Sequence, residues 1–206
     1  MSDQKEFLAR YVPHQAVDQL LVLLKQHPLQ LKVSKPRKTK YGDYRFPRQP
    51  GQPHRISVNA NLNSYAFLIT LLHEVAHLEA FKKYGRSIKP HGPEWQNSFR
   101  DISAPYLTTA IFPPPVLHAF RKSLARGVAS SCTDLELFKV LNQYDKPVMD
   151  GTLTLEELQK GATFALQQKV MTKGAKSRVR YRCTEIKSHR VYMVHPLAQV
   201  IPIKNE

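Results

Sequence analysis

Hydrophobic positions along the chain first follow a helical spacing. In residues 13–26 apolar side chains recur at intervals of three and four, which predicts a helix that ends at Pro28. Residues 64–84 predict a longer helix, with Ser64 as its N-cap and Gly85 as its stop. This segment is apolar almost all round and therefore belongs in a core, so the polar residues inside it need an explanation.

Between these two helices the spacing of apolar residues falls towards two. Residues 29–59 predict three short strands in a small antiparallel sheet, with a hairpin turn at 41–44 and a loop at 47–53. After the long helix, Pro93 and Glu94 favour the start of another helix, because proline and an acid both suit a first helical turn.

The second half of the chain predicts shorter elements. Helices are expected at 116–126 and 134–143, and strands at 162–170, 178–186 and 190–194. In the middle strand arginines alternate with apolar residues, which places the arginines on one face. These strands form a small basic β module.

Together the elements predict an α+β fold. A chain of 206 residues is long enough for one domain with a core and a small appendage. We expect a core at 1–103, a helical, proline-interrupted connecting segment at 104–160, and the β module at 161–206.

Composition excludes several classes of protein. A chain that is 42% hydrophobic and 23% charged is globular, and the longest aliphatic run, 20–24, is too short to cross a bilayer. The N-terminus lacks the pattern of a secretory signal. Cys132 and Cys183 are the only cysteines, which excludes a disulfide framework and a four-cysteine zinc finger. We therefore expect a cytoplasmic monomer without a membrane partner.

The net charge of +15 is concentrated in two windows of the chain. Residues 35–55 hold seven basic residues and one acid, and residues 169–190 hold eight and one. Such clusters suggest a nucleic acid, because phosphates attract lysine and arginine, although the same residues could simply solubilise two exposed hairpins. The candidate contacts are Arg37, Lys38, Lys40, Arg45, Arg178, Arg180 and Arg182.

Tyrosines lie within or directly next to both windows of basic residues. Tyrosine beside arginine can stack on unpaired bases, which favours single-stranded or junction DNA. For Tyr181, which shares a strand face with Val179 and Cys183, a place in the core is the better interpretation. The tyrosines are Tyr41, Tyr44, Tyr181 and Tyr192.

The long helix contains the sequence His-Glu-Val-Ala-His at residues 73–77. His73 and His77 are four residues apart and lie on one helical face, so both imidazoles can reach one metal ion. Glu74 is then placed to take a proton from water that the metal activates. Histidines that merely form hydrogen bonds are the alternative interpretation.

A zinc ion with an open position needs a third protein ligand. His91 follows His77 by 14 residues and precedes a predicted helix, so a loop after Gly85 can return it to the site. Glu94 is the alternative ligand, as in sites with two histidines and one glutamate.

The segments Leu-Leu-His-Glu-Val-Ala-His at 71–77 and His-Gly-Pro-Glu-Trp at 91–95 resemble the SprT-like family of zinc metallopeptidases, which includes the Spartan proteases. The resemblance covers about residues 10–103, and Trp95 stands where phenylalanine is usual. It implies a zincin-like core with an N-terminal helix, the three-stranded sheet, the HExxH helix and the third-histidine helix. It makes His73, His77 and His91 the Zn²⁺ ligands and Glu74 the catalytic acid/base.

The tail departs from the family pattern. Many members carry a C-terminal zinc ribbon with paired cysteines, whereas this tail has only Cys183. We expect a ribbon-like module without metal; a second site formed by Cys183, His189 and His195 is the alternative.

Family resemblance implies a zinc-dependent endopeptidase that cleaves proteins crosslinked to or trapped on DNA. Two alternatives are a non-catalytic nucleic-acid-binding or scaffold protein with a structural zinc site, and a zinc hydrolase with a non-protein substrate. Glu74 argues against the scaffold, because a structural site needs the ligands but not the base.

Overall fold

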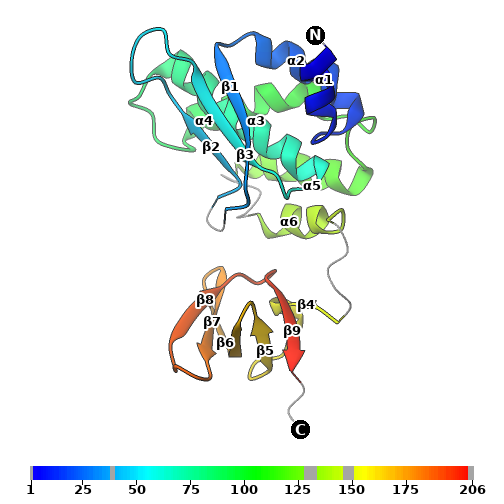
Figure 1. The fold of residues 1–206 in the computed structure, drawn as a ribbon, viewed down its shortest axis with the longest axis vertical. Coiled ribbons are helices and arrows are strands. Elements are labelled where there is room, and N and C mark those ends of the chain that lie inside the picture. The colour runs from blue at the N-terminus through cyan, green and yellow to red at the C-terminus, as the bar shows by residue number, and fades with distance from the viewer. Residues whose placement is uncertain (1, 38–39, 128–133, 146–150, 204–206) are drawn as a thin grey trace. The chain divides into compact units, whose positions relative to one another are not determined.

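The computed structural model describes residues 2–37, 40–127, 134–145 and 151–203, and it confirms a mixed α+β fold. The chain divides into two compact units, Met1–Asp145 and Lys146–Glu206 (Figure 1). Each unit has its own cluster of buried apolar side chains.

The first unit combines a small sheet with helices. Helix α3 packs against β2, β3 and α4. The elements in chain order are α1 (Ser2–Ala9), a 3-10 turn (His14–Ala16), α2 (Val17–Lys25), β1 (Leu29–Ser34), β2 (Gly42–Arg45), β3 (His54–Asn59), α3 (Ser64–Tyr84), α4 (Pro93–Ser103), a 3-10 turn (Ala104–Tyr106), α5 (Pro114–Arg126) and α6 (Leu135–Asn142).

The sheet has the order β1-β3-β2, with β1 parallel and β2 antiparallel to β3. It is mixed, so the expectation of an antiparallel sheet is wrong, and residues 41–44 lie mostly in β2 rather than in a hairpin turn. Arg37 helps to hold the chain in this path. Its Nε donates to Asn59 Oδ1 at 2.8 Å and its Nη1 to Ser57 Oγ at 3.0 Å, which fastens the β1–β2 connection to β3.

Helix α3 has the bounds that the sequence predicts. Its N-cap, however, is Asn63 rather than Ser64: the Asn63 Oδ1 accepts from the backbone N–H of Ala66 at 2.9 Å. Gly85 ends the helix with a φ of 75°, a conformation that glycine adopts without strain. The predicted helix at 13–26 divides into the 3-10 turn and α2, and α1 is an element that we did not predict.

Residues 104–145 belong to the first unit instead of connecting two parts. Phe112, Phe120 and Leu137 are buried in the same cluster as the α3 side chains, and the Phe99 and Phe120 rings lie 5.9 Å apart. The expected connecting segment at 104–160 is therefore shared between the two units, because its apolar residues up to Leu141 complete the first core.

The second unit contains a six-stranded sheet of order β4-β9-β5-β6-β7-β8. The predicted strand at 162–170 is broken by a turn at Gln167, and that at 178–186 begins only at Arg180, because Arg178 lies in a turn with a φ of 53°. Strand β9 was not predicted. The strands are β4 (Leu153–Thr154), β5 (Thr163–Leu166), β6 (Lys169–Ser177), β7 (Arg180–Glu185), β8 (Val191–Val194) and β9 (Gln199–Ile203).

The alternation expected in the arginine strand is confirmed within β7. Arg180 and Arg182 are exposed, whereas Cys183 is fully buried and Tyr181 is half-buried. Among the described residues, no helix is long and apolar enough to cross a membrane.

Candidate metal centre

Three histidine side chains of the first unit converge on one point. The Nε2 atoms of His73 and His77, one turn apart on α3, lie 3.1 Å from each other. His91, from the loop before α4, brings its Nε2 to 3.1 Å from that of His77 and 3.2 Å from that of His73. The three are the only group of this kind among the described residues, and such a group could hold a metal ion.

The loop that carries His91 has an unusual backbone. His91 itself has a φ of 58°, which is uncommon for a residue other than glycine. The Gln96 side chain donates from Nε2 to the His91 carbonyl at 3.1 Å, and the N–H of Gly92 donates to Lys89 O at 2.8 Å. A hypothetical Cβ on Gly92 would lie 2.9 Å from Lys89 O, so the tight turn that presents His91 favours glycine.

Trp95, on the first turn of α4, lies against all three histidines. Its ring centroid is 4.6 Å from that of His73, 5.3 Å from His77 and 4.7 Å from His91. The side chain is almost completely buried. This contact, which the sequence did not indicate, restricts the imidazoles by packing.

Burial also sets the protonation of the histidines. Desolvation lowers the pKa of His73 well below its usual value and that of His77 to about 4, and it also lowers the pKa of His91. All three imidazoles are therefore neutral near pH 7, and the neutral form is the one that binds metal.

The histidine geometry fits a zinc ion. Nitrogens bound at about 2.0–2.1 Å with tetrahedral angles lie about 3.3 Å apart, close to the spacings observed. Glu94, the alternative third ligand, is not part of this group. Cys183 is a buried free thiol, and the described structure does not bring it within ligand distance of His189 and His195, the other two residues of the alternative second metal site.

Glu74 lies on the same helix and its side chain is buried between α3 and β2. Desolvation raises the pKa of Glu74 to about 8; Asp43 adds to this rise, while Arg37, Lys40 and a hydrogen bond from the Tyr44 backbone oppose it. A carboxyl group that titrates near neutral pH can both accept and release a proton, as an acid/base catalyst must.

Gly42 on β2 has no side chain, and the Glu74 carboxylate occupies the space that a Cβ at this position would fill. A Cβ at Gly42 would lie 2.2 Å from Glu74 Oε1, so Gly42→Ala must displace the carboxylate. We expect this variant to keep its metal affinity and to lose about 10²-fold or more of any rate that depends on Glu74 as an acid/base group. Zinc analysis and kcat/KM measure both effects.

A matched control is Gly174→Ala in the second unit, whose added methyl group would meet Arg182 O at 2.3 Å. It should leave the cleavage of a free peptide unchanged. Full activity of Gly42→Ala would show that Glu74 does not need its observed position.

The predicted nucleic-acid contacts fall into different environments. Lys40 and Arg45 are exposed at β2 and both pair with Asp43, at 2.6 and 2.8 Å. The Arg37 guanidinium is hydrogen-bonded to Asn59 and Ser57, and Lys38 lies outside the described residues. In the second unit Arg178, Arg180 and Arg182 are all exposed.

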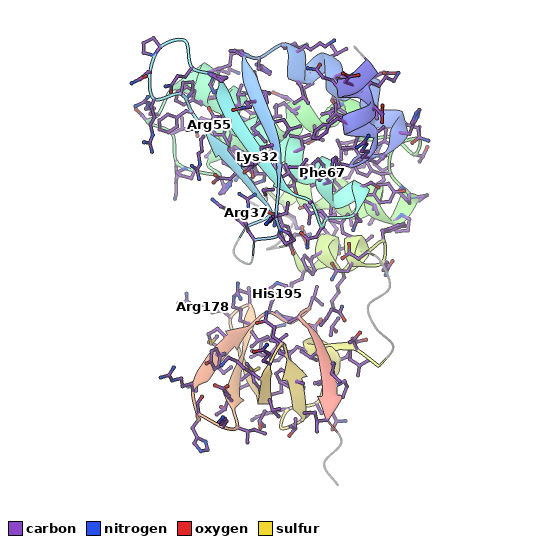
Figure 2. The ribbon with its side chains drawn as sticks, in the orientation of Figure 1. Lys32, Arg37, Arg55, Phe67, Arg178 and His195 are labelled. Atoms are coloured by element: carbon purple, nitrogen blue, oxygen red, sulfur yellow. The ribbon has the colours of Figure 1, made fainter. Side chains whose placement is uncertain are left out.

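The outward face of the three-stranded sheet carries cations that the candidate contacts omit. Lys32 on β1 and Arg55 on β3 are exposed there, in strands whose alternate residues face the core (Figure 2). Arg45 pairs directly with Arg55 across the β2–β3 ladder. The alternation of β1 and β3 in the sequence could have identified both residues.

Tyr44, Tyr181 and Tyr192 pack against a core, and Tyr41 packs against another aromatic ring. Tyr44 stacks on His77, with ring centroids 6.3 Å apart, and its hydroxyl forms a 2.9 Å hydrogen bond with His54 Nδ1. Tyr41 stacks on Phe138, while Lys173 and Lys169 lie over the Tyr181 and Tyr192 rings. All four are half-buried, so their packing does not favour base stacking.

Comparison with known proteins gives one match. The model of the SprT-like family matches residues 5–114, which include the whole histidine group and Glu74. No curated protein and no solved structure matches the chain.

Proposed function

Because the chain belongs to the SprT-like family, we propose that it is a zinc-dependent endopeptidase of the HExxH type that acts on DNA-associated proteins. The observation that carries the proposal is the convergence of three neutral imidazoles, with Nε2 atoms 3.1–3.2 Å apart, two of them on the helix that also carries the buried Glu74. Three protein ligands leave a fourth position open, as catalysis requires.

The metal-binding residues of this proposal are His73, His77 and His91. When bound, zinc supplies Lewis acidity, which activates water and polarises a peptide carbonyl. Trp95 restricts the imidazoles from one side, and Tyr44 stacks on His77.

Glu74 handles the protons of the proposed reaction. Its carboxylate accepts a proton from the attacking water and, as a carboxylic acid, passes it to the leaving amine. The hydrogen bond from the Tyr44 backbone and the space left by Gly42 orient the carboxylate, and burial gives it a pKa of about 8.

We propose DNA as the partner on the strength of charge. Exposed cations on the sheet face (Lys32, Arg45, Arg55) and on the second unit (Arg178, Arg180, Arg182) suit the phosphate backbone. Because the tyrosine rings are packed against other side chains, only these cations support DNA as the partner. We therefore expect a weaker preference for single-stranded DNA than free tyrosine rings would give.

The proposal is tested with the full, zinc-loaded chain and a DNA-binding protein as substrate. We expect cleavage when the substrate is bound to DNA and slower cleavage when DNA is absent. Zinc removal by a chelator should abolish cleavage, and readdition should restore it. A zinc-loaded chain that cuts no protein under either condition would favour the non-catalytic alternative.

The cations of the second unit give a separate prediction. Changing Arg178, Arg180 and Arg182 together to Ala should flatten the slope of log affinity against log salt by about two to three units, if each arginine contacts one phosphate. DNA titrations at several salt concentrations measure the slope. The control removes three exposed cations in α1, α2 and the turn after α1, namely Lys5, Lys25 and Arg10, and should leave the slope unchanged. Identical slopes for both triple variants would remove the arginines from the DNA surface.

A further inference from the structure

An apolar recess opens beside the metal centre of the first unit. Its lining includes His77, His91 and Trp95, so it directly adjoins two of the three imidazoles. Apart from these residues and Gly85, the recess is lined by the apolar side chains of Phe46, Phe81, Ile88 and Pro90 and by the cationic residues Arg86 and Lys89. We call it the aromatic recess.

The walls of the aromatic recess come from three parts of the fold. Phe81 lies one helical turn beyond His77 on α3. Phe46, directly after β2, stacks on Phe81 with ring centroids 5.3 Å apart and planes 4° from parallel. Gly85 ends α3 and lets the chain turn back through Ile88 to His91, which closes the opposite side.

The charged groups of the aromatic recess have one sign. The Arg86 guanidinium lies 4.4 Å from the centre of the Phe46 ring, and its Nη2 donates to Pro47 O at 3.5 Å. Lys89 adds a second cation, and no acidic side chain lines the recess among the described residues. The charges therefore oppose the entry of a lysine or arginine side chain.

We propose that the aromatic recess is the subsite that receives an apolar side chain of the substrate, next to the peptide bond that is cut. The inference rests on the proposed peptidase function, which it extends by a substrate class. A side chain held here leaves its backbone beside His77 and His91, and therefore next to the metal centre. Phe46 and Phe81 are its specificity-determining residues.

The expected selectivity follows from apolar burial. Adding one methylene in a fitted apolar pocket changes transition-state binding by roughly 10- to 200-fold at best. An open recess of this kind should therefore favour a leucine over a glycine by about 10- to 100-fold in kcat/KM. A lysine at the same position should be no better than the glycine, because Arg86 and Lys89 repel it.

The first measurement is cleavage by the full, zinc-loaded chain of peptides that differ at one position, with Leu, Gly or Lys next to the cut bond, and mass spectrometry to locate the cut. The second measures binding of the same peptides to the zinc-loaded Glu74→Gln protein. Trp95 is the only tryptophan of the chain and lines the recess, so its fluorescence reports on this site without turnover.

Two variants change the lining of the aromatic recess. Phe46→Ala removes a side chain that is 40% exposed and should not affect folding, and it should reduce the Leu-over-Gly ratio by about tenfold. Ile88→Phe fills the recess and should reduce Leu binding while Gly binding is retained. The control, Phe7→Ala, removes an equally exposed phenylalanine from α1 and should leave the ratio unchanged.

The outcomes separate the inference from the function on which it rests. Leu-selective fluorescence changes that Phe46→Ala reduces would support the recess as a binding subsite even if no peptide were cut, in which case the peptidase proposal alone would fail. Cleavage without any preference for Leu, or equal Leu and Gly binding, would overturn the inference and leave the peptidase proposal standing.

Discussion

Replacement of Glu74 by Gln should abolish most of the peptidase activity while zinc remains bound. The amide has the same shape and can still accept the hydrogen bond from the Tyr44 backbone, but it cannot take a proton from water. Losing a general acid/base typically lowers the rate by about 10²- to 10⁴-fold. Turnover of a DNA-bound protein substrate and zinc content should be measured on the same preparation.

Glu79→Gln is a suitable control for this variant. Glu79 is an acid of the same helix that pairs with His27, at 3.1 Å, and takes no part in the histidine group. Its replacement should leave turnover close to the wild-type value. Near wild-type turnover of Glu74→Gln would instead show that this carboxyl group does not carry the chemistry.

Replacement of His91 by Ala should lower the affinity for zinc far more than replacement of Glu94 or His118. Residues that only support a ligand typically contribute 10- to 100-fold to metal affinity, so removal of a direct ligand should cost at least about 10²-fold. Competition between the protein and a zinc chelator of known affinity measures the zinc affinity of the wild type and the variant. His73 and His77 alone offer two nitrogens, too few for a stable tetrahedral site.

Two variants identify the third ligand. Glu94→Gln should bind zinc like the wild type, because Glu94 lies outside the histidine group. His118→Ala removes an exposed histidine of α5 and should also have no effect. Unchanged zinc affinity in His91→Ala, together with a loss in Glu94→Gln, would transfer the ligand role to Glu94.

The sequence determines the parts of this protein that depend on short-range spacing. Residues four apart on a helix share a face, so the arrangement of His73 and His77 follows from their spacing alone. Gly85 and Pro93 mark the end of α3 and the start of α4, because each suits its local backbone. The alternation of arginines and apolar residues likewise identified the exposed face of β7.

Only the tertiary structure decided which strands pair and what surrounds the site. Alternation shows which side chains share a face, but it does not specify the neighbouring strand. The sequence therefore did not reveal the parallel β1–β3 pairing or the hydrogen bonds by which Arg37 holds the β1–β2 connection to β3. Residues 104–145 showed a broken pattern, yet they complete the first core, because burial depends on contacts distant in sequence.

The same division holds within the metal centre. His-Glu-Val-Ala-His specified two imidazoles and a carboxylate, since their relation is set by one helix. The place of Gly42 against Glu74, and of Trp95 against all three imidazoles, arises where β2 and α4 pack on α3. Contacts between separate elements leave no fixed spacing in the sequence, and for that physical reason they became visible only in the folded chain.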